Sequence, residues 1–75
     1  MPTLKRLREE AMLTQEELAR ACGVSRQAVM KWEHGQTRPS MPVRRKLVEV
    51  LGKTPKEVLD ALDATAEEAK KGAAA

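Results

Sequence analysis

The stretch from Thr14 to Gly35 constrains the fold of this chain more than any other. It reads as two short helices separated by Gly23, placed where a left-handed residue is expected to end the first helix. Thr14 and Glu17 have the spacing of a capping box, in which each side chain bonds the other residue's backbone amide. Ser25 is the expected cap of the second helix. The stretch therefore predicts two consecutive helices joined by a tight turn.

Three further helices are predicted around this pair, and no segment has the pattern of a strand. The first is expected over roughly Leu4–Met12, where leucine and alanine recur at helical spacing. The fourth lies between a cap at Ser40 and a stop at Gly52, and the fifth runs from Pro55 to about Leu62 behind a second capping box. The pattern predicts an all-α domain of five helices over residues 1–62.

Composition limits the core and excludes several classes of protein. A chain of 75 residues makes one small domain, and with one Trp and no Phe or Tyr its core must be aliphatic. The single cysteine, Cys22, excludes an internal disulfide and a zinc site built from several cysteines, and it is expected to be a packing residue rather than a redox switch. No run approaches the ~18 apolar residues of a membrane span, and no signal peptide is recognisable. We expect a cytoplasmic protein.

Residues 63–75 differ in composition from the rest of the chain, because alanine, glutamate and lysine dominate them. Their helix propensity is high, but their only apolar side chains are alanines. Two states stay open for this tail: an extension of the fifth helix that frays, or disorder from about Lys71.

Charge is distributed unevenly along the chain. The net charge is +3, but residues 20–56 hold nine basic and two acidic residues, whereas residues 1–19 and 57–75 are both net negative. A basic block of this kind is typical of a protein with a polyanion as its partner. Incidental solvated lysines and arginines are the alternative explanation.

The second helix of the pair, roughly Arg26–His34, has two chemically different faces. The inward face holds Ser25, Ala28, Val29 and Trp32. The outward face holds Arg26, Gln27, Met30, Lys31 and His34. Trp32 is therefore expected in the core. Arginine can donate to guanine N7 and O6, glutamine pairs with adenine, and a methionine methyl contacts thymine. The outward face thus has the chemistry of base recognition, and an ordinary solvated helix face is the alternative.

The spacing of these residues resembles the helix-turn-helix of phage repressor and Cro proteins, the XRE family. The matching residues are Gln15, Leu18, Ala19, Gly23, Val24, Ser25, Val29, Trp32, Glu33 and Gly35, then Arg38, Pro39, Ser40, Leu51, Gly52, Val58 and Leu59. The resemblance covers residues 4–62. It implies a repressor-like domain with the helix-turn-helix in its second and third helices. The implied function is a sequence-specific transcription regulator, expected to be a repressor that binds an inverted-repeat operator in double-stranded DNA as a homodimer.

The resemblance also implies roles for individual residues. Base contacts are expected from Arg26, Gln27 and Lys31, with Met30 as a weaker candidate. Contacts to the DNA backbone are expected from Gln15, which also buttresses the third helix, and from Gln36, Thr37, Arg38 and Arg8. Arg8 and Glu33 are expected to form a partly buried ion pair. Dimer contacts are expected from Val58, Leu59 and Leu62, for which packing in the chain's own core is the alternative. The run Arg44–Lys46 departs from the family's pattern, and either solvation or backbone contact fits it.

Nothing in the sequence indicates an enzyme, a cofactor or a metal site, because no nucleophile with a base, glycine-rich phosphate loop or ligand cluster occurs. Two other functions stay open. An antitoxin would keep the DNA site and bind a protein partner through the acidic segment Asp63–Lys71. A protein-interaction module on the same fold would have lost DNA binding, and the basic block argues against it.

Overall fold

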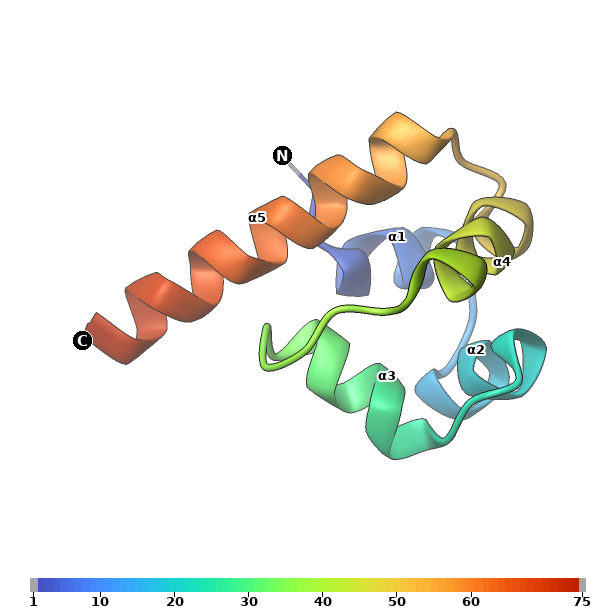
Figure 1. Ribbon diagram of the computed structural model, residues 1–75, viewed down its shortest axis with the longest axis horizontal. Coiled ribbons are helices and arrows are strands. Elements are labelled where there is room, and N and C mark those ends of the chain that lie inside the picture. Colours follow the sequence, from blue (N-terminus) through green and yellow to red (C-terminus); the bar gives the residue numbers. More distant parts are fainter. Residues whose placement is uncertain (1, 75) are drawn as a thin grey trace.

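Five helices make up residues 2–74, the part of the chain that the computed structural model describes, and no strand occurs there (Figure 1). They are α1 (Leu4–Glu10), α2 (Gln15–Cys22), α3 (Arg26–Glu33), α4 (Met41–Leu51) and α5 (Pro55–Ala74). Side chains are described for residues 2–71, and residue 75, the last of the predicted tail, lies outside the described residues. The all-α, five-helix prediction is confirmed.

The helix ends follow the local signals in the sequence with one exception. Thr14 accepts from the amide of Glu17 at 3.1 Å and its own amide donates to the Glu17 carboxylate at 2.9 Å. These bonds, above all the one from the Thr14 amide, lower the pKa of Glu17. Gly23 ends α2 in the left-handed region at φ 71°. Ser40, however, makes no side-chain capping bond. Ser40 nevertheless occupies the N-cap position, as predicted, with extended backbone angles of φ −67° and ψ 164°.

Every helix contributes to one aliphatic core. Its buried apolar residues are Leu4, Leu7, Leu18, Ala19, Cys22, Val29, Trp32, Leu47, Leu51, Val58, Ala61 and Leu62. Trp32 is 5% exposed, as predicted for a core residue. Burial raises the pKa of the Cys22 thiol, which keeps the thiol protonated and suits a packing role.

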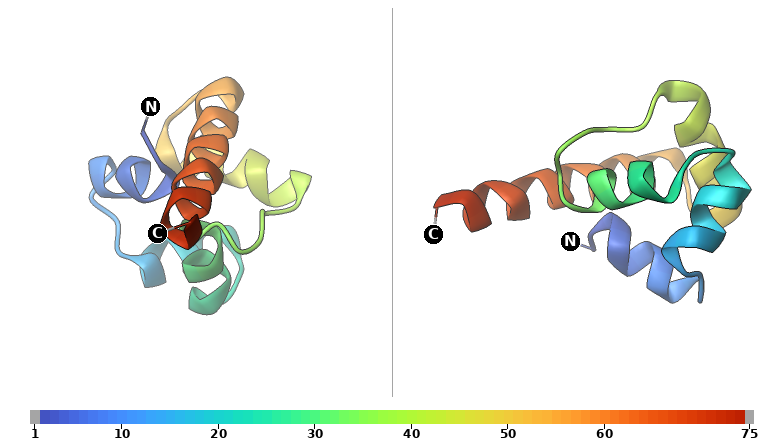
Figure 2. Two further views of the ribbon diagram at one scale, coloured as in Figure 1. Left: turned by 90° about the vertical axis from the view of Figure 1, so that its left-hand side faces the viewer. Right: turned by 90° about the horizontal axis from the view of Figure 1, so that it is seen from below.

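Helix α5 continues past Leu62 to Ala74, so the tail extends the fifth helix, which was one of the two states that the sequence left open. The buried face extends by one further turn to Thr65, which is 4% exposed. The Thr65 hydroxyl accepts from the amide of Leu4 at 3.0 Å and donates to the carbonyl of Ala61 at 2.8 Å. It thereby satisfies the first amide of α1, which has no partner within its own helix. The last part of α5 projects past the other helices (Figure 1 and the right-hand view of Figure 2).

The turn between α1 and α2 places Met12 in the left-handed region at φ 59°, with its side chain 89% exposed. This conformation is unfavourable for any residue with a Cβ. We expect Met12→Gly to raise the free energy of unfolding by about 1 kcal/mol, and the melting temperature by about 4–8 °C in a domain of this size. Thermal unfolding followed by circular dichroism measures the shift. Met12→Ala is the control, because it removes the exposed side chain and keeps the Cβ. An equal rise in melting temperature in both variants would show that the left-handed backbone at Met12 is not the cause.

Candidate nucleic-acid interface

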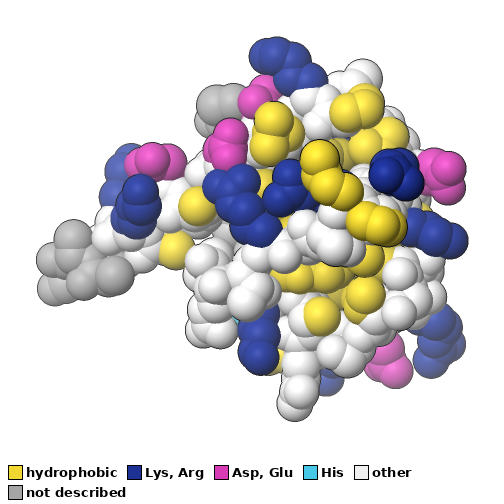
Figure 3. Space-filling model, in the orientation of Figure 1, with side chains coloured by type: hydrophobic (Ala, Val, Ile, Leu, Met, Phe, Trp, Pro, Cys, Tyr) yellow, Lys and Arg dark blue, Asp and Glu magenta, His cyan; other side chains and the backbone are white. Residues whose placement is uncertain are grey.

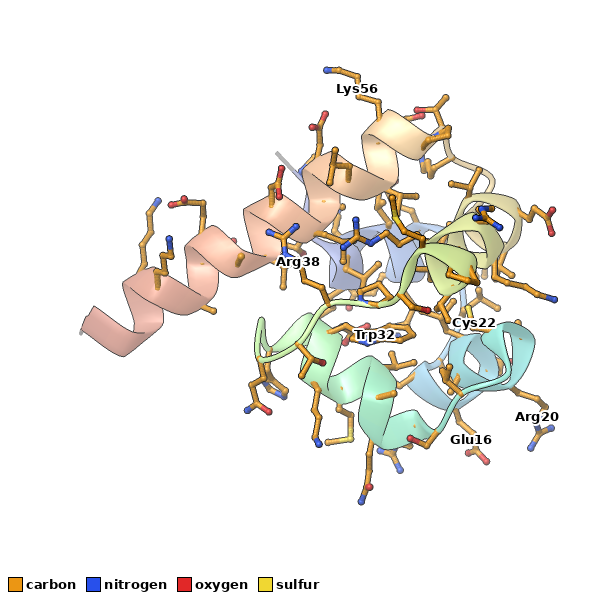
Figure 4. All side chains as sticks on the ribbon, in the orientation of Figure 1. Glu16, Arg20, Cys22, Trp32, Arg38 and Lys56 are labelled. Atoms are coloured by element: carbon orange, nitrogen blue, oxygen red, sulfur yellow. The ribbon has the colours of Figure 1, made fainter. Side chains whose placement is uncertain are left out.

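The two faces of α3 are separated in the structure as the sequence predicted, except that Ser25, expected on the inward face, is exposed. Val29 is fully buried, and Trp32 points from α3 into the body of the protein (Figure 4). On the opposite face Arg26, Gln27 and Lys31 are exposed, and Met30 is partly buried. Seen from below, α3 lies at the surface, on the underside of the protein in the view of Figure 1 (Figure 2, right). Packing of the inner face therefore fixes which side chains a partner would meet.

A buried polar network joins α3 to the two preceding helices. The Nε of Arg8 lies 2.6 Å from Oε2 of Glu33, and its Nη2 lies 3.4 Å from Oε1. The side-chain amide of Gln15 donates to the same Oε1 at 2.9 Å. Arg8 also donates to the carbonyl of Leu13 at 2.7 Å. The side chains of Arg8 and Glu33 are 11% and 4% exposed. The structure thus brings together the expected ion pair and the glutamine that was expected to buttress α3.

A shallow hollow of about 410 Å³ lies between the start of α2 and the start of α3. It is lined by Arg8, Thr14, Gln15, Glu16 and Arg26. Two residues expected at the DNA backbone, Arg8 and Gln15, therefore lie next to one expected at the bases, Arg26. The first amides of a helix and a nearby guanidinium favour an anion, although the exposed carboxylate of Glu16 opposes one.

The loop from α3 to α4 forms side-chain contacts with both α4 and α5. Gln36 and Thr37 are exposed on it. Arg38 does not extend freely into solvent, because its Nη2 lies 2.9 Å from Oδ1 of Asp63 on α5. From the other side, Nε of Arg44 donates to the carbonyl of Pro39 at 3.0 Å. Sequence reasoning left Arg44 unassigned, although it follows Pro39 by only five residues. It missed Asp63, because Asp63 lies on α5, which the sequence does not place beside the loop.

Only one of the three expected dimer residues is accessible. Val58 and Leu62 are 1% and 3% exposed and pack in the chain's own core, whereas Leu59 is 43% exposed. Positions 58 and 62 are one helical turn apart and share the inward stripe of α5, and position 59 lies about 100° around the helix. Val58 and Leu62 therefore follow the alternative interpretation, in which they pack in the chain's own core rather than against a second copy.

Leu59 lies in an open groove of about 550 Å³ between α4 and α5. The apolar lining residues are Met41, Val48, Pro55, Val58 and Leu59. Arg44, Arg45 and Glu49 complete the lining. In Figure 3 apolar side chains gather on this face with basic side chains beside them. Met41 is 64% exposed, so this groove offers accessible apolar surface from α4 as well as from α5.

Over the residues described, no group of three or more His, Cys, Asp or Glu side chains is arranged to hold a metal ion. In the same part of the chain, no helix has the length and apolar character needed to span a membrane.

Comparison with known proteins places this geometry in context. The helix-turn-helix family model matches residues 4–58, from the start of α1 into the first turn of α5. An uncharacterised HTH-type transcriptional regulator of Methanothermobacter thermautotrophicus is 39% identical over 56 residues, which are 75% of this chain and 81% of the relative. No solved structure matches the chain significantly.

Proposed function

This chain belongs to the helix-turn-helix family of DNA-binding transcription regulators, the XRE family, and we propose that it is a repressor that binds an inverted-repeat operator as a homodimer. We take residues 1–62 as the DNA-binding domain. A protein that occupies a promoter blocks transcription without any further activity, so DNA binding by this domain is sufficient for the proposed role.

The outer face of α3 is the observation that carries the proposal. Arg26, Gln27 and Lys31 are exposed on one side of a helix whose other side is buried in the core. In the helix-turn-helix mode the start of the second helix enters the major groove, where Arg26 and Gln27 would meet base edges first. The guanidinium and the carboxamide are the groups that discriminate guanine and adenine there.

Backbone contacts would come from the start of α2 and from the loop after α3. The three hydrogen bonds of Arg8 to Glu33 and Leu13 leave two of its five N–H donors for a phosphate at the adjoining hollow. Gln15 lines the same hollow, and Gln36 and Thr37 are exposed on the loop. Such contacts position the protein and add salt dependence without reading sequence.

We propose the groove between α4 and α5 as the contact between two copies. Met41, Val48 and Leu59 would supply the apolar centre in place of the predicted Val58 and Leu62. A two-fold contact must be self-complementary. The presence of both Arg45 and Glu49 in the groove supports the proposal, because each copy would present a cation to the other's carboxylate.

The antitoxin alternative receives less support from the surface of α5. The exposed side chains after Thr65 are Glu67, Glu68, Lys70 and Lys71, all of them charged. A partner-binding helix is expected to present an apolar face, and this segment exposes none among its described side chains.

In vitro selection from a random duplex pool, with purified protein at near-physiological salt, tests the proposal. Enrichment of an inverted repeat with half-sites about one helical turn apart is expected. A single enriched half-site would argue against the homodimer. A pool without any enriched sequence would contradict sequence-specific regulation.

The base-reading roles give a quantitative expectation. Arg26→Ala and Gln27→Ala should each weaken binding to the selected operator by about 1–3 kcal/mol, or about 5- to 150-fold, and relax the preference at one base pair. Fluorescence anisotropy on the operator and on single-base variants measures both effects. Lys56→Ala is the matched control for charge, because Lys56 is 84% exposed on α5, pairs with Asp60 at 3.6 Å and lies on the opposite side of the protein from α3 (Figure 4). If a variant loses the same affinity for every DNA sequence, then the residue that was replaced, Arg26 or Gln27, does not contact a base.

A further inference from the structure

The ion pair between the α3–α4 loop and α5 has no role in the function proposed so far. Arg38 points towards α5 (Figure 4), and its guanidinium lies 2.9 Å from the Asp63 carboxylate. Both side chains are solvent-accessible, at 42% and 56% exposure. Asp63 lies beyond residue 58, where the family match ends. The pair therefore connects a loop expected at the DNA backbone with a part of α5 that the family does not define.

Packing of α5 holds Asp63 beside this loop. A Cβ added at Gly35, just after α3, would lie 2.6 Å from the Cβ of Ala69 and 3.3 Å from the carbonyl oxygen of Thr65. Thr65 itself bonds the first amide of α1. The turn of α5 after Leu62 thus packs against the end of α3 and the start of α1. Asp63 is consequently a fixed negative charge at the edge of the interface rather than part of a loose tail.

Arg38 differs in this respect from the exposed cations of α3, and its ion pair is far more exposed than the pair of Arg8 with Glu33. Within the described side chains, Arg26 and Lys31 form no ion pair, whereas Arg38 does. A carboxylate and a phosphate offer a guanidinium the same kind of oxyanion. An exposed ion pair contributes little to stability, so a phosphate can replace the carboxylate without unfolding anything. The carboxylate then stays close to the phosphate as a like charge.

From these contacts we infer that Asp63 lowers the affinity for DNA, because its carboxylate competes with the phosphates of the DNA backbone for Arg38. The inference rests on the proposed function, in which Arg38 contacts the backbone. Phosphate contacts carry no sequence information. Asp63 therefore weakens the sequence-independent part of binding and leaves a larger share of the affinity to the base contacts of α3.

Asp63→Asn removes the charge and keeps the shape of the side chain. We expect affinity for the operator and for an unrelated duplex to rise about three- to tenfold at near-physiological salt. The plot of log affinity against log salt should become steeper by about one unit. The melting temperature should change by only a few degrees. Asp60→Asn is the matched control, because it changes the net charge equally and disrupts only the pair with Lys56 at 3.6 Å, on the same helix; we expect less than a twofold change.

Arg38→Gln shows whether Asp63 acts through Arg38. Alone, this substitution should weaken binding to any duplex, and adding Asp63→Asn to it should change affinity by less than twofold. Unchanged or weaker binding by Asp63→Asn alone would overturn the inference, and so would a gain that persists without Arg38. Normal binding by Arg38→Gln, with binding impaired by Arg26→Ala, would overturn the inference and leave the proposed function standing. Failure of the wild-type protein to select any DNA sequence would overturn the proposed function itself.

Discussion

Glu33→Ala should lower the free energy of unfolding by about 3–5 kcal/mol and weaken DNA binding at the same time. The Glu33 carboxylate is 4% exposed and accepts hydrogen bonds from both Arg8 and Gln15. Its removal leaves the Arg8 guanidinium, at 11% exposure, without a counter-charge. Total stability for a domain of this length is about 4–11 kcal/mol, so the loss is a large fraction of it. Urea unfolding followed by circular dichroism, with anisotropy on the operator, measures the two effects.

Two further variants separate the charge from the packing. Glu16→Ala is the control for stability alone, because its carboxylate is 69% exposed and pairs with Arg20 at the surface; we expect its free energy of unfolding to change by less than about 0.5 kcal/mol. In Arg8→Met combined with Glu33→Leu, neither buried charge remains, so much of the stability should return. DNA binding should stay weak in this double variant, because Gln15 has lost its partner and Arg8 no longer reaches a phosphate. Near-wild-type stability of Glu33→Ala would contradict the structural role of the network.

Gly35→Ala is expected to lower the free energy of unfolding by about 2–4 kcal/mol through two separate effects. The residue has φ +72°, a conformation that disfavours any Cβ, and the added Cβ would lie 2.6 Å from that of Ala69. Gly23→Ala isolates the first effect, since Gly23 has φ +71° and nothing within 4 Å of its added Cβ. That variant should lose only about 1 kcal/mol.

A double-mutant cycle isolates the steric effect at the same position. Ala69→Gly removes the clashing methyl group, so Gly35→Ala should be less destabilising in that background than in the wild type. The remaining loss should approach that of Gly23→Ala. If Gly35→Ala is no more destabilising than Gly23→Ala in the wild-type background, then α5 does not pack against the end of α3, and Asp63 is not held beside the loop.

The local structure of the helix-turn-helix was predictable from the sequence. The capping box of Thr14 and Glu17, the turn at Gly23 and the cap at Ser25 all act over three or four residues, and the structure has all of them. The buried side of α3 was equally predictable, because Val29 and Trp32 follow the helical period. Ser40 was correctly placed at the start of α4, although its side chain makes no capping bond there.

The contacts between residues far apart in the sequence were not predictable in the same way. Alanine-rich composition left the state of residues 63–75 open, because helix propensity alone does not decide whether an isolated segment is ordered. The added turn of α5 packs because Thr65 meets the first amide of α1, 61 residues away. Likewise, the periodicity of α5 indicated an apolar stripe but not whether a second copy or the chain's own core covers it.

The sequence by itself therefore determined the helices, the family and the exposed face of α3, since each depends on short-range patterns or on motif spacing. The tertiary structure decided which charges are paired. It joined Arg8, Gln15 and Glu33, and it set Asp63 beside Arg38. The physical reason is that an ion pair depends on a distance of a few ångströms between side chains from different helices, and that distance is set only when all five helices pack together.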